Sequence, residues 1–409
     1  MSEVKFIPPK QSPLFTRLAQ SIFYVVAYFV YKIRLVIDET DVAKLKAIAD
    51  QRAVYLPNHS NLDDGFAIFL LSARVGQLFH YVVALEAFQG IVGILIQRIG
   101  AYSIRRGVGD RQSIIQTLKI LQQPQCKLLI FPEGGCSYQN DTVMPFRFGA
   151  FELSFKAMEK LIKKNGVVPD FYLVPVSLKY HYPHAGDRQI EQALTRLETA
   201  LSLRGKDDFY TRLRNIGLKI LSSLEAEYQV KVVETNDWNQ RINRLRQQML
   251  SYCETKLEIT PIEHLPDRER VYKIQALLRS NSPIKLQSTS KEAHIYLTTV
   301  RLLNFDAIYD GYVAEKPSTE RFFDTIDRFE REVFQSDRPK FKGRRQVITK
   351  IGEPINLKAY WSEYQAATST LPNQPNSSAQ KSSSSLTSRQ RVVEKLTKSI
   401  QQTVQANLN

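Results

Sequence analysis

The chain of 409 residues has few of the residues that build a disulfide framework. It holds three cysteines, Cys126, Cys136 and Cys253, and no Cys-x-x-Cys pair. A small and odd number of cysteines argues against a disulfide scaffold and favours a reducing cytoplasm. Zinc-finger, ribonucleoprotein and basic-zipper motifs are also missing, so the sequence gives no motif-based indication of nucleic-acid binding.

The apolar run near the N-terminus is too short for a comfortable membrane span. It covers residues 18–31, with Arg17 before it and Lys32 and Arg34 after it, whereas a span needs about 20 apolar residues. It has no small-residue cleavage site of a signal peptide. Aromatic residues with basic flanks are typical of a helix in the membrane interface, but a buried first helix shows the same pattern. We expect a membrane-associated helix in residues 1–40, on the cytoplasmic face, which either spans or lies on the membrane.

Acidic residues are outnumbered by basic ones. The chain has 56 Lys and Arg against 41 Asp and Glu, a net charge of +15 and a pI near 9.5. This excess predicts an anionic partner: nucleic acid, an acidic membrane surface or a phosphate-bearing substrate. Because nucleic-acid motifs are missing, we favour a membrane surface with anionic lipids and a phosphate-bearing substrate.

Strand-like and helix-like runs alternate between residues 53 and 180. This alternation predicts an α/β fold with a mixed sheet flanked by helices. The expected strands are 53–57, 79–84, 102–104, 127–131 and 171–179, and the expected helices are 61–75, 110–123 and 149–164.

The remainder of the chain changes character twice. Residues 184–337 are charged and helical and form a large α-helical insertion between two parts of the α/β core, residues 41–183 and 338–409. The strand signal returns at 346, and a last helix is expected at 390–408. Between them, residues 366–388 are rich in Ser, Pro, Asn and Gln, which predicts a flexible loop.

One of only six histidines stands in a setting suited to catalysis. His59 precedes Asp64 by five residues, where a predicted strand gives way to a predicted helix. A carboxylate beside an imidazole fixes its tautomer and stabilises its charged form, which a general base requires. The alternative is ordinary helix capping, with Asn61 as the N-cap and Asp64 as an acidic residue of the first turn.

Three further stretches carry candidate chemistry. The sequence Phe-Pro-Glu-Gly-Gly at 131–135 follows a predicted buried strand, where ligands bind in open α/β sheets, although it also suits a tight turn. Arg105 and Arg106 are adjacent in an extended segment, so one can face a cleft and bind phosphate, unless both lie in a solvated basic turn. Pro175 interrupts the strand 171–179, which indicates an edge strand or a bulge.

In this order the four stretches resemble the four blocks of the glycerolipid acyltransferase family, which includes lysophosphatidate and glycerol-3-phosphate acyltransferases. Asn58-His59, four residues and Asp64 match its NHxxxxD block, and Phe-Pro-Glu-Gly at 131–134 matches its FPEG block. Residues 100–106, which end Ile-Arg-Arg, look like the second block, and Val-Pro-Val at 174–176 looks like the fourth. Gly-Glu-Pro-Ile at 352–355 is similar to the closing strand. The resemblance covers residues 53–180 and 346–408.

The resemblance implies the acyltransferase fold and the transfer of a fatty acyl chain to a hydroxyl of a glycerophosphate or lysophospholipid acceptor. The acyl donor is then a thioester of coenzyme A or an acyl carrier protein, and neither a metal nor another cofactor is expected. The roles implied are His59 as general base, Asp64 as its orienting partner, Arg105 and Arg106 on the phosphate, Glu133, Gly134 and Gly135 on the acceptor, and Val176 in the channel wall.

The sequence departs from the family pattern after Gly134. The FPEG block usually continues with Thr or Ser and then Arg, but here it continues Gly135-Cys136-Ser137. Either Arg105, Arg147 or another basic side chain replaces the missing arginine, or the acceptor is a non-phosphorylated alcohol. A non-catalytic lipid-binding protein on a decayed scaffold is a further alternative, and Cys136 as a nucleophile is a minor one.

The helical insertion lies outside the resemblance. We expect it to act as a lid over the acyl channel, a membrane-docking surface or a platform for a donor protein. The segment 338–350 after it carries six basic residues and no acidic one. This segment suits anionic headgroups or an acidic carrier protein, or it is a solvated basic loop.

Overall fold

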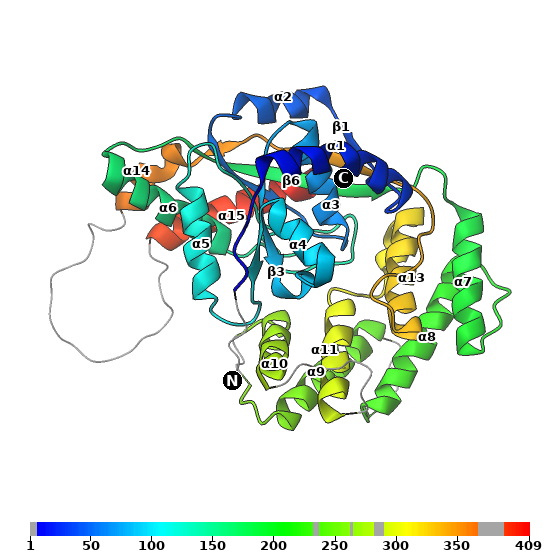
Figure 1. The fold of residues 1–409 in the computed structure, drawn as a ribbon. Helices are drawn as coiled ribbons and strands as arrows, with labels where there is room; N and C mark the ends of the chain where they lie inside the picture. The colour runs from blue at the N-terminus through cyan, green and yellow to red at the C-terminus, as the bar shows by residue number, and fades with distance from the viewer. Residues whose placement is uncertain (1–5, 232–236, 262–264, 282–289, 367–387) are drawn as a thin grey trace.

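The α/β core is one mixed sheet of eight strands, as the alternating signals predict. A computed structural model describes the chain except residues 1–5, 232–236, 262–264, 282–289 and 367–387 (Figure 1). Neighbouring strands follow the order β1-β7-β6-β2-β5-β3-β4, and β8 also pairs with β6. The strands are β1 Ile33–Ile37, β2 Arg52–Pro57, β3 His80–Ala84, β4 Ala101–Ile104, β5 Lys127–Leu129, β6 Phe171–His181, β7 Arg345–Ile351 and β8 Ile355–Asn356.

The central strands β2 and β5 are parallel neighbours, with Tyr55 opposite Leu129. Strand β6 continues the parallel pairing on the other side of β2 and is antiparallel to β7 and β8. Because β2 and β5 end at the same edge of the sheet, the loops that follow them leave side by side. Ligands bind at this carboxyl edge in open α/β sheets.

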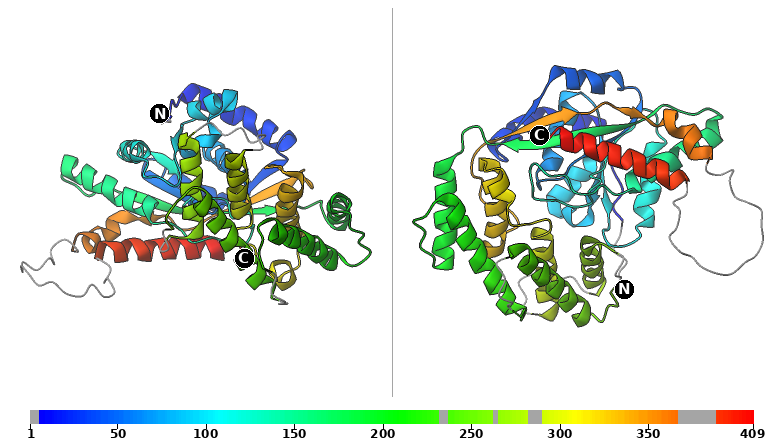
Figure 2. Two further views of the ribbon diagram at one scale, coloured as in Figure 1. Left: turned by 90° about the horizontal axis from the view of Figure 1, so that it is seen from below. Right: turned by 180° about the vertical axis from the view of Figure 1, so that it is seen from behind.

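Helices cover both faces of the sheet, and the alternation of side chains along β2 shows the two layers. Val54 and Leu56 pack with one layer, whereas Ala53 and Tyr55 pack with the other. Strands buried on both faces are continuous apolar runs. Figure 2 shows the C-terminal helix crossing the rear face of the sheet. The first layer has α5 Arg111–Leu121, α6 Gly149–Asn165, α14 Trp361–Ala366 and α15 Ser388–Ala406, and the second has α1 Pro13–Phe29, α2 Glu39–Ala47 and α3 Asp64–Arg74.

The insertion between β6 and β7 is helical and packs around its own apolar core. We call residues 187–334 the helical module. It lies beside the carboxyl edge of the sheet rather than on either face (Figure 1). Its helices are α7 Asp187–Leu201, α8 Phe209–Glu227, α9 Trp238–Lys256, α10 Asp267–Asn281, α11 Lys291–Asn304, α12 Tyr312–Glu315 and α13 Thr319–Phe334.

The expectation that Pro175 marks an edge strand is wrong. Strand β6 has partners on both sides, and Pro175 itself lies opposite Leu56 of β2. On the other side, its carbonyl accepts a hydrogen bond of 3.0 Å from the amide of Gly352, in the gap between β7 and β8. A proline has no N–H to donate. Pro175 lies between the stretch of β6 that pairs with β7 and the stretch that pairs with β8, so no strand opposite it on this side requires that N–H.

Helix α1 combines a buried side with an exposed apolar side. Gln20 and Ala27 are buried, and the amide of Ser12 donates to the carbonyl of Arg98 at the end of α4 (Gly90–Arg98). None of the helices in the described part of the chain is both long and apolar enough to cross a bilayer. The predicted flexible loop, 366–388, falls almost wholly outside the described residues.

Candidate active site

The loop after β2 brings His59 and Asp64 together. Nδ1 of His59 lies 2.9 Å from Oδ2 of Asp64, which is the first residue of α3 and is fully buried. The imidazole ring stacks on Phe131, with 4.3 Å between ring centroids. With Nδ1 held by the carboxylate, Nε2 is the ring atom left to exchange a proton with a substrate.

Asp64 is held from two further directions. Its Oδ1 accepts a hydrogen bond of 2.7 Å from the hydroxyl of Tyr180 on β6, and its Oδ2 accepts one of 2.9 Å from the amide of Asn61. Helix capping therefore does not explain this carboxylate. The expectation that Asn61 is the N-cap is wrong, because α3 starts three residues later and Asn61 Oδ1 instead accepts from the amide of Asp63.

The Glu133 side chain is hydrogen-bonded to the backbone of His59. Its Oε1 accepts a hydrogen bond of 2.7 Å from the His59 amide. Burial raises the pKa of Glu133 to about 8, against the lowering effects of the backbone amides of His59 and Met144 and of the charge on Arg268. Glu133 is therefore mostly protonated at neutral pH, and its carboxyl group holds the backbone of the loop that carries His59.

Two cavities meet at His59. One, of about 500 Å³, is lined by apolar side chains of the sheet and of α5 and α6, together with Arg105, Arg106, Gly134 and Gly135. The other, of about 750 Å³, lies between the core and α10, α11 and the end of α13. His59 and Arg106 line both. Two reactants can therefore approach one imidazole from different sides.

The structure does not bring every expected residue to these cavities. Val176 and Glu133 are both buried, and neither is among the described residues that line the two cavities. Cys136 lines the larger cavity, but burial raises the pKa of its thiol well above the usual range. A thiol that stays protonated is a poor nucleophile, so the geometry favours His59 as the reactive group.

The basic segment 338–350 is only partly a solvated loop, because Arg338, Lys340, Arg344 and Lys350 are exposed whereas Lys342 and Arg345 are not. Arg345 is buried and pairs with Asp63 at 2.7 Å, and the side chain of Lys342, which is 7% exposed, lies beside Asp327 and Glu330. These two cations join the core to the helical module and the loop after β2. They are therefore not available to lipid headgroups, which corrects the expectation for this part of the segment.

Tyr180 and several residues of the helical module reach the site without any sequence motif to mark them. Strand β6 is predicted to end at residue 179, one residue before Tyr180. Extending the alternation of buried side chains along β6 by one residue would have placed Tyr180 on the side of the sheet that faces Asp64. Arg268 and Arg328 donate to the carbonyls of Cys136 and Ser137, more than 120 residues away in the chain. Tyr272 accepts a hydrogen bond from Arg106, 166 residues away, and only the tertiary arrangement brings these residues to the site.

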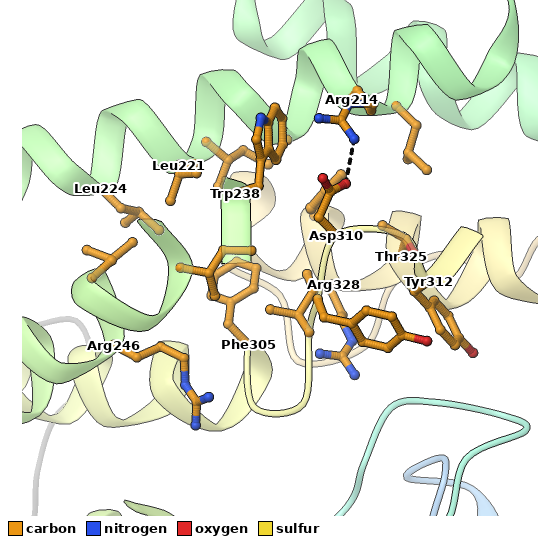
Figure 3. A pocket seen from close by; sticks show the side chains of 18 of the residues that line it. Arg214, Leu221, Leu224, Trp238, Arg246, Phe305, Asp310, Tyr312, Thr325 and Arg328 are labelled. Atoms are coloured by element: carbon orange, nitrogen blue, oxygen red, sulfur yellow. Dashed lines mark hydrogen bonds and ion pairs between the residues drawn. The ribbon is translucent and has the colours of Figure 1, made fainter. Parts of the chain in front are cut away.

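The helical module also holds a separate apolar cavity of about 110 Å³, lined mainly by α8, α9 and the 305–313 segment (Figure 3). The ion pair of Arg214 with Asp310, at 2.5 Å, lies in its wall. Gln139 and Arg328 also line it, and both belong to the contacts between the module and the loop after Gly134. This cavity is distinct from the two that His59 lines.

Comparison with known families identifies the core. The family model described as Acyltransferase matches residues 37–179. These residues form an acyltransferase domain of the glycerolipid acyltransferase family, and the matched range contains His59, Asp64, Arg105, Arg106 and Glu133. The match ends at Lys179 within β6, so the helical module lies outside it.

Protonation of Glu133 gives a test by pH. A carboxyl whose pKa rises from 4.5 to about 8 on folding keeps its proton in the folded state while the unfolded chain loses it. Folding stability from this group is therefore lost as pH rises from 4.5 and levels off above about 8. We expect the Glu133→Gln variant to lose stability less steeply over this range, measured as urea midpoints at several pH values. Glu353→Gln, at an exposed carboxylate, is the control, and equal pH slopes for Glu133→Gln and wild type would contradict the assignment.

Proposed function

We propose that the protein transfers a fatty acyl chain from a thioester, of coenzyme A or an acyl carrier protein, to a hydroxyl of a glycerophosphate or lysophospholipid. Acyl transfer follows from the family of the core. The observation that supports the finer proposal most is the His59–Asp64 pair at 2.9 Å, with its ring in the wall of both cavities. One cavity can take the thioester while the other takes the acceptor.

The proposed reaction needs one base and no covalent enzyme intermediate. Nε2 of His59 accepts the proton of the acceptor hydroxyl as its oxygen attacks the thioester carbonyl. Asp64 stabilises the imidazolium that forms. The tetrahedral intermediate then collapses, the C–S bond breaks, and the imidazolium returns the proton to the thiolate. A thioester is already activated, so this chemistry proceeds without a metal ion.

The proposed acceptor site lies beside Gly134 and Gly135. Arg105 and Arg106 both line the smaller cavity, and Arg105 is half-exposed while its Nε lies 3.6 Å from Asp110. Guanidinium groups bind phosphate oxygens through paired N–H donors. Glu133, which precedes Gly134, supports this site by accepting a hydrogen bond from the His59 amide.

The proposal is tested by one screen of purified protein with acyl-CoA and acyl-acyl-carrier-protein donors. The acceptors are glycerol 3-phosphate, lysophosphatidate, lysophosphatidylcholine and monoacylglycerol. We expect transfer to a phosphate-bearing acceptor. Transfer to monoacylglycerol alone would support the alcohol-acceptor alternative. Tight liposome binding with no transfer from either donor would support a lipid-binding protein without activity.

We further propose that α1 and α4 dock on a membrane surface. Both helices lie on the side of the sheet that faces the viewer in Figure 1, and the ends that meet are joined through Ser12 and Arg98. Large apolar side chains on both are exposed, up to 83% for Leu14 and 76% for Ile91. Exposed apolar surface of this kind marks an interaction site. The exposed members are Leu14, Leu18, Ile22, Tyr24, Val25, Phe29 and Val30 on or next to α1, and Ile91, Val92, Ile94 and Leu95 on α4.

A charge on this face should weaken membrane binding. We expect Ile91→Asp to lower the fraction of protein that sediments with phosphatidylglycerol-containing vesicles about tenfold, because a charged group resists burial in the acyl-chain boundary. Val167→Asp is the matched control, since Val167 is 68% exposed but follows α6 in the chain. Equal binding of both variants would show that α4 does not dock.

A further inference from the structure

Helix α10 of the helical module lies directly on the two loops that carry the proposed acceptor site. A Cβ added at Gly107 would overlap the backbone of Tyr272, and one added at Gly135 would overlap the Tyr272 hydroxyl. The same Cβ at Gly135 would lie 3.0 Å from Nη1 of Arg268. Both glycines are therefore required for the close approach of α10, and the module forms part of the site's wall.

Tyr272 holds Arg106 in place. Its hydroxyl is 3.2 Å from Nη1 of Arg106, whose guanidinium carbon lies 4.6 Å from the centre of the tyrosine ring. Glu86 lies 3.7 Å from the far nitrogen, Nη2. Nε of Arg106 is buried and has no partner among the described residues. The arrangement orients Arg106 and leaves one of its N–H donors free for a ligand.

Arg268, on the same helix as Tyr272, also has an N–H donor without a partner in the described part of the chain. It is 8% exposed, its Nε pairs with Asp306 at 2.6 Å, and its Nη2 donates to the carbonyl of Cys136 at 3.2 Å. Nη1 is buried and unpaired among the described residues. A buried guanidinium nitrogen without an acceptor costs free energy unless a ligand satisfies it. This nitrogen is the one directed at Gly135.

We propose that α10 completes the anion-binding part of the acceptor site. Arg268 donates from Nη1 to a phosphate group of the acceptor that binds in the smaller cavity beside Gly135, and Tyr272 positions Arg106 for the same group. This inference rests on the proposed function and adds the specificity for a phosphate-bearing acceptor. The helical module is then required for acceptor recognition as well as for covering the site.

The test compares two acceptors that differ in the phosphate, oleoyl lysophosphatidate and oleoyl monoacylglycerol. We expect Arg268→Gln to raise KM for lysophosphatidate about 10- to 100-fold, as for the loss of one charge-assisted hydrogen bond. Its kcat/KM for monoacylglycerol should stay within about twofold of wild type. Inorganic phosphate, used as a competitive inhibitor, should lose potency against the variant to a similar degree.

Two further variants keep the test decisive. Arg268→Lys retains the charge and should recover part of the lost affinity, and Tyr272→Phe should raise KM for lysophosphatidate while keeping the ring under Arg106. Arg270→Gln is the matched control, because Arg270 is on the same helix but pairs with Glu254 of α9. If Arg268→Gln does not fold, Tyr272→Phe alone decides the outcome.

The outcomes separate this inference from the proposed function. Equal losses on both acceptors, or none, overturn the role of α10 while wild-type transfer still stands. Absence of transfer by the wild type overturns the proposed function instead. In that case phosphate binding, measured as the thermal shift of wild type against Arg268→Gln, still decides whether α10 builds an anion site.

Discussion

Replacement of His59 by alanine is expected to lower acyl transfer by about a thousandfold, the effect typical of removing a general base. The fold should persist, because the imidazole lines two cavities and its main-chain contacts to Glu133 and Ser137 do not involve the side chain. The measurement is kcat/KM with the best donor and acceptor of the screen, together with the thermal midpoint of the variant.

Replacement of Asp64 should also lower acyl transfer, but its loss should not add to that of the His59 replacement. Asp64→Asn leaves a neutral partner that no longer stabilises the imidazolium, and we expect a loss on the order of a hundredfold or more. In the double variant the loss should match that of His59→Ala alone, because residues that act as one unit give non-additive effects. Additive losses would mean that Asp64 acts on the reaction by a route that does not pass through His59.

The structure offers a matched control for the pair. Nδ1 of His181 lies 2.9 Å from Oε1 of Glu320, the same separation as in the His59–Asp64 pair, but this pair is on the surface. We expect His181→Ala to keep full transfer. Full activity of His59→Ala would instead show that the base is another group.

Local patterns predicted most of the core and half of the site. The strand and helix positions between residues 52 and 180 follow mostly from short runs of apolar side chains, and His59 and Asp64 are close in sequence. Strand β1, within the expected N-terminal helix region, and helix α2 are not predicted. The sheet order does not follow from such patterns. Strand β7 comes from beyond the helical module and pairs with both β1 and β6, which depends on contacts across about 160 residues or more.

The contacts of the helical module could not be predicted for the same reason. The departure at Gly135 was visible in the sequence, but its cause is Tyr272, which occupies the space of a side chain at that position. Similarly, the basic segment 338–350 has no acidic residue of its own, yet Lys342 pairs with the buried Glu330 of α13 and Arg345 pairs with the buried Asp63 before α3. Charge patterns along one segment do not show which distant carboxylates neutralise it.

Replacement of Arg328 by methionine is expected to give the largest loss of stability. Its fully buried guanidinium donates to the carbonyls of Asn304 and Asp306 in the module and, at 2.6 Å, to that of Ser137. The Ser137 amide in turn donates to the carbonyl of His59 at 2.7 Å. Methionine fills the space but leaves buried carbonyls unpaired, so we expect a loss of roughly 3–5 kcal/mol in the free energy of unfolding.

Arg196→Met tests whether removing any arginine that pairs helices of the module lowers the free energy of unfolding as much as Arg328→Met does. Arg196 pairs with Glu330 of α13 at 3.1 Å, but it is partly exposed and Lys342 also pairs with Glu330. A pair of this kind contributes up to about 1 kcal/mol. Urea denaturation of both variants decides between a specific and a general effect. If Arg328→Met unfolds at the wild-type midpoint, the module does not hold the loop that carries Ser137. If it is destabilised as expected, acyl transfer at a temperature where it is still folded should also fall, because this loop bonds the backbone of His59.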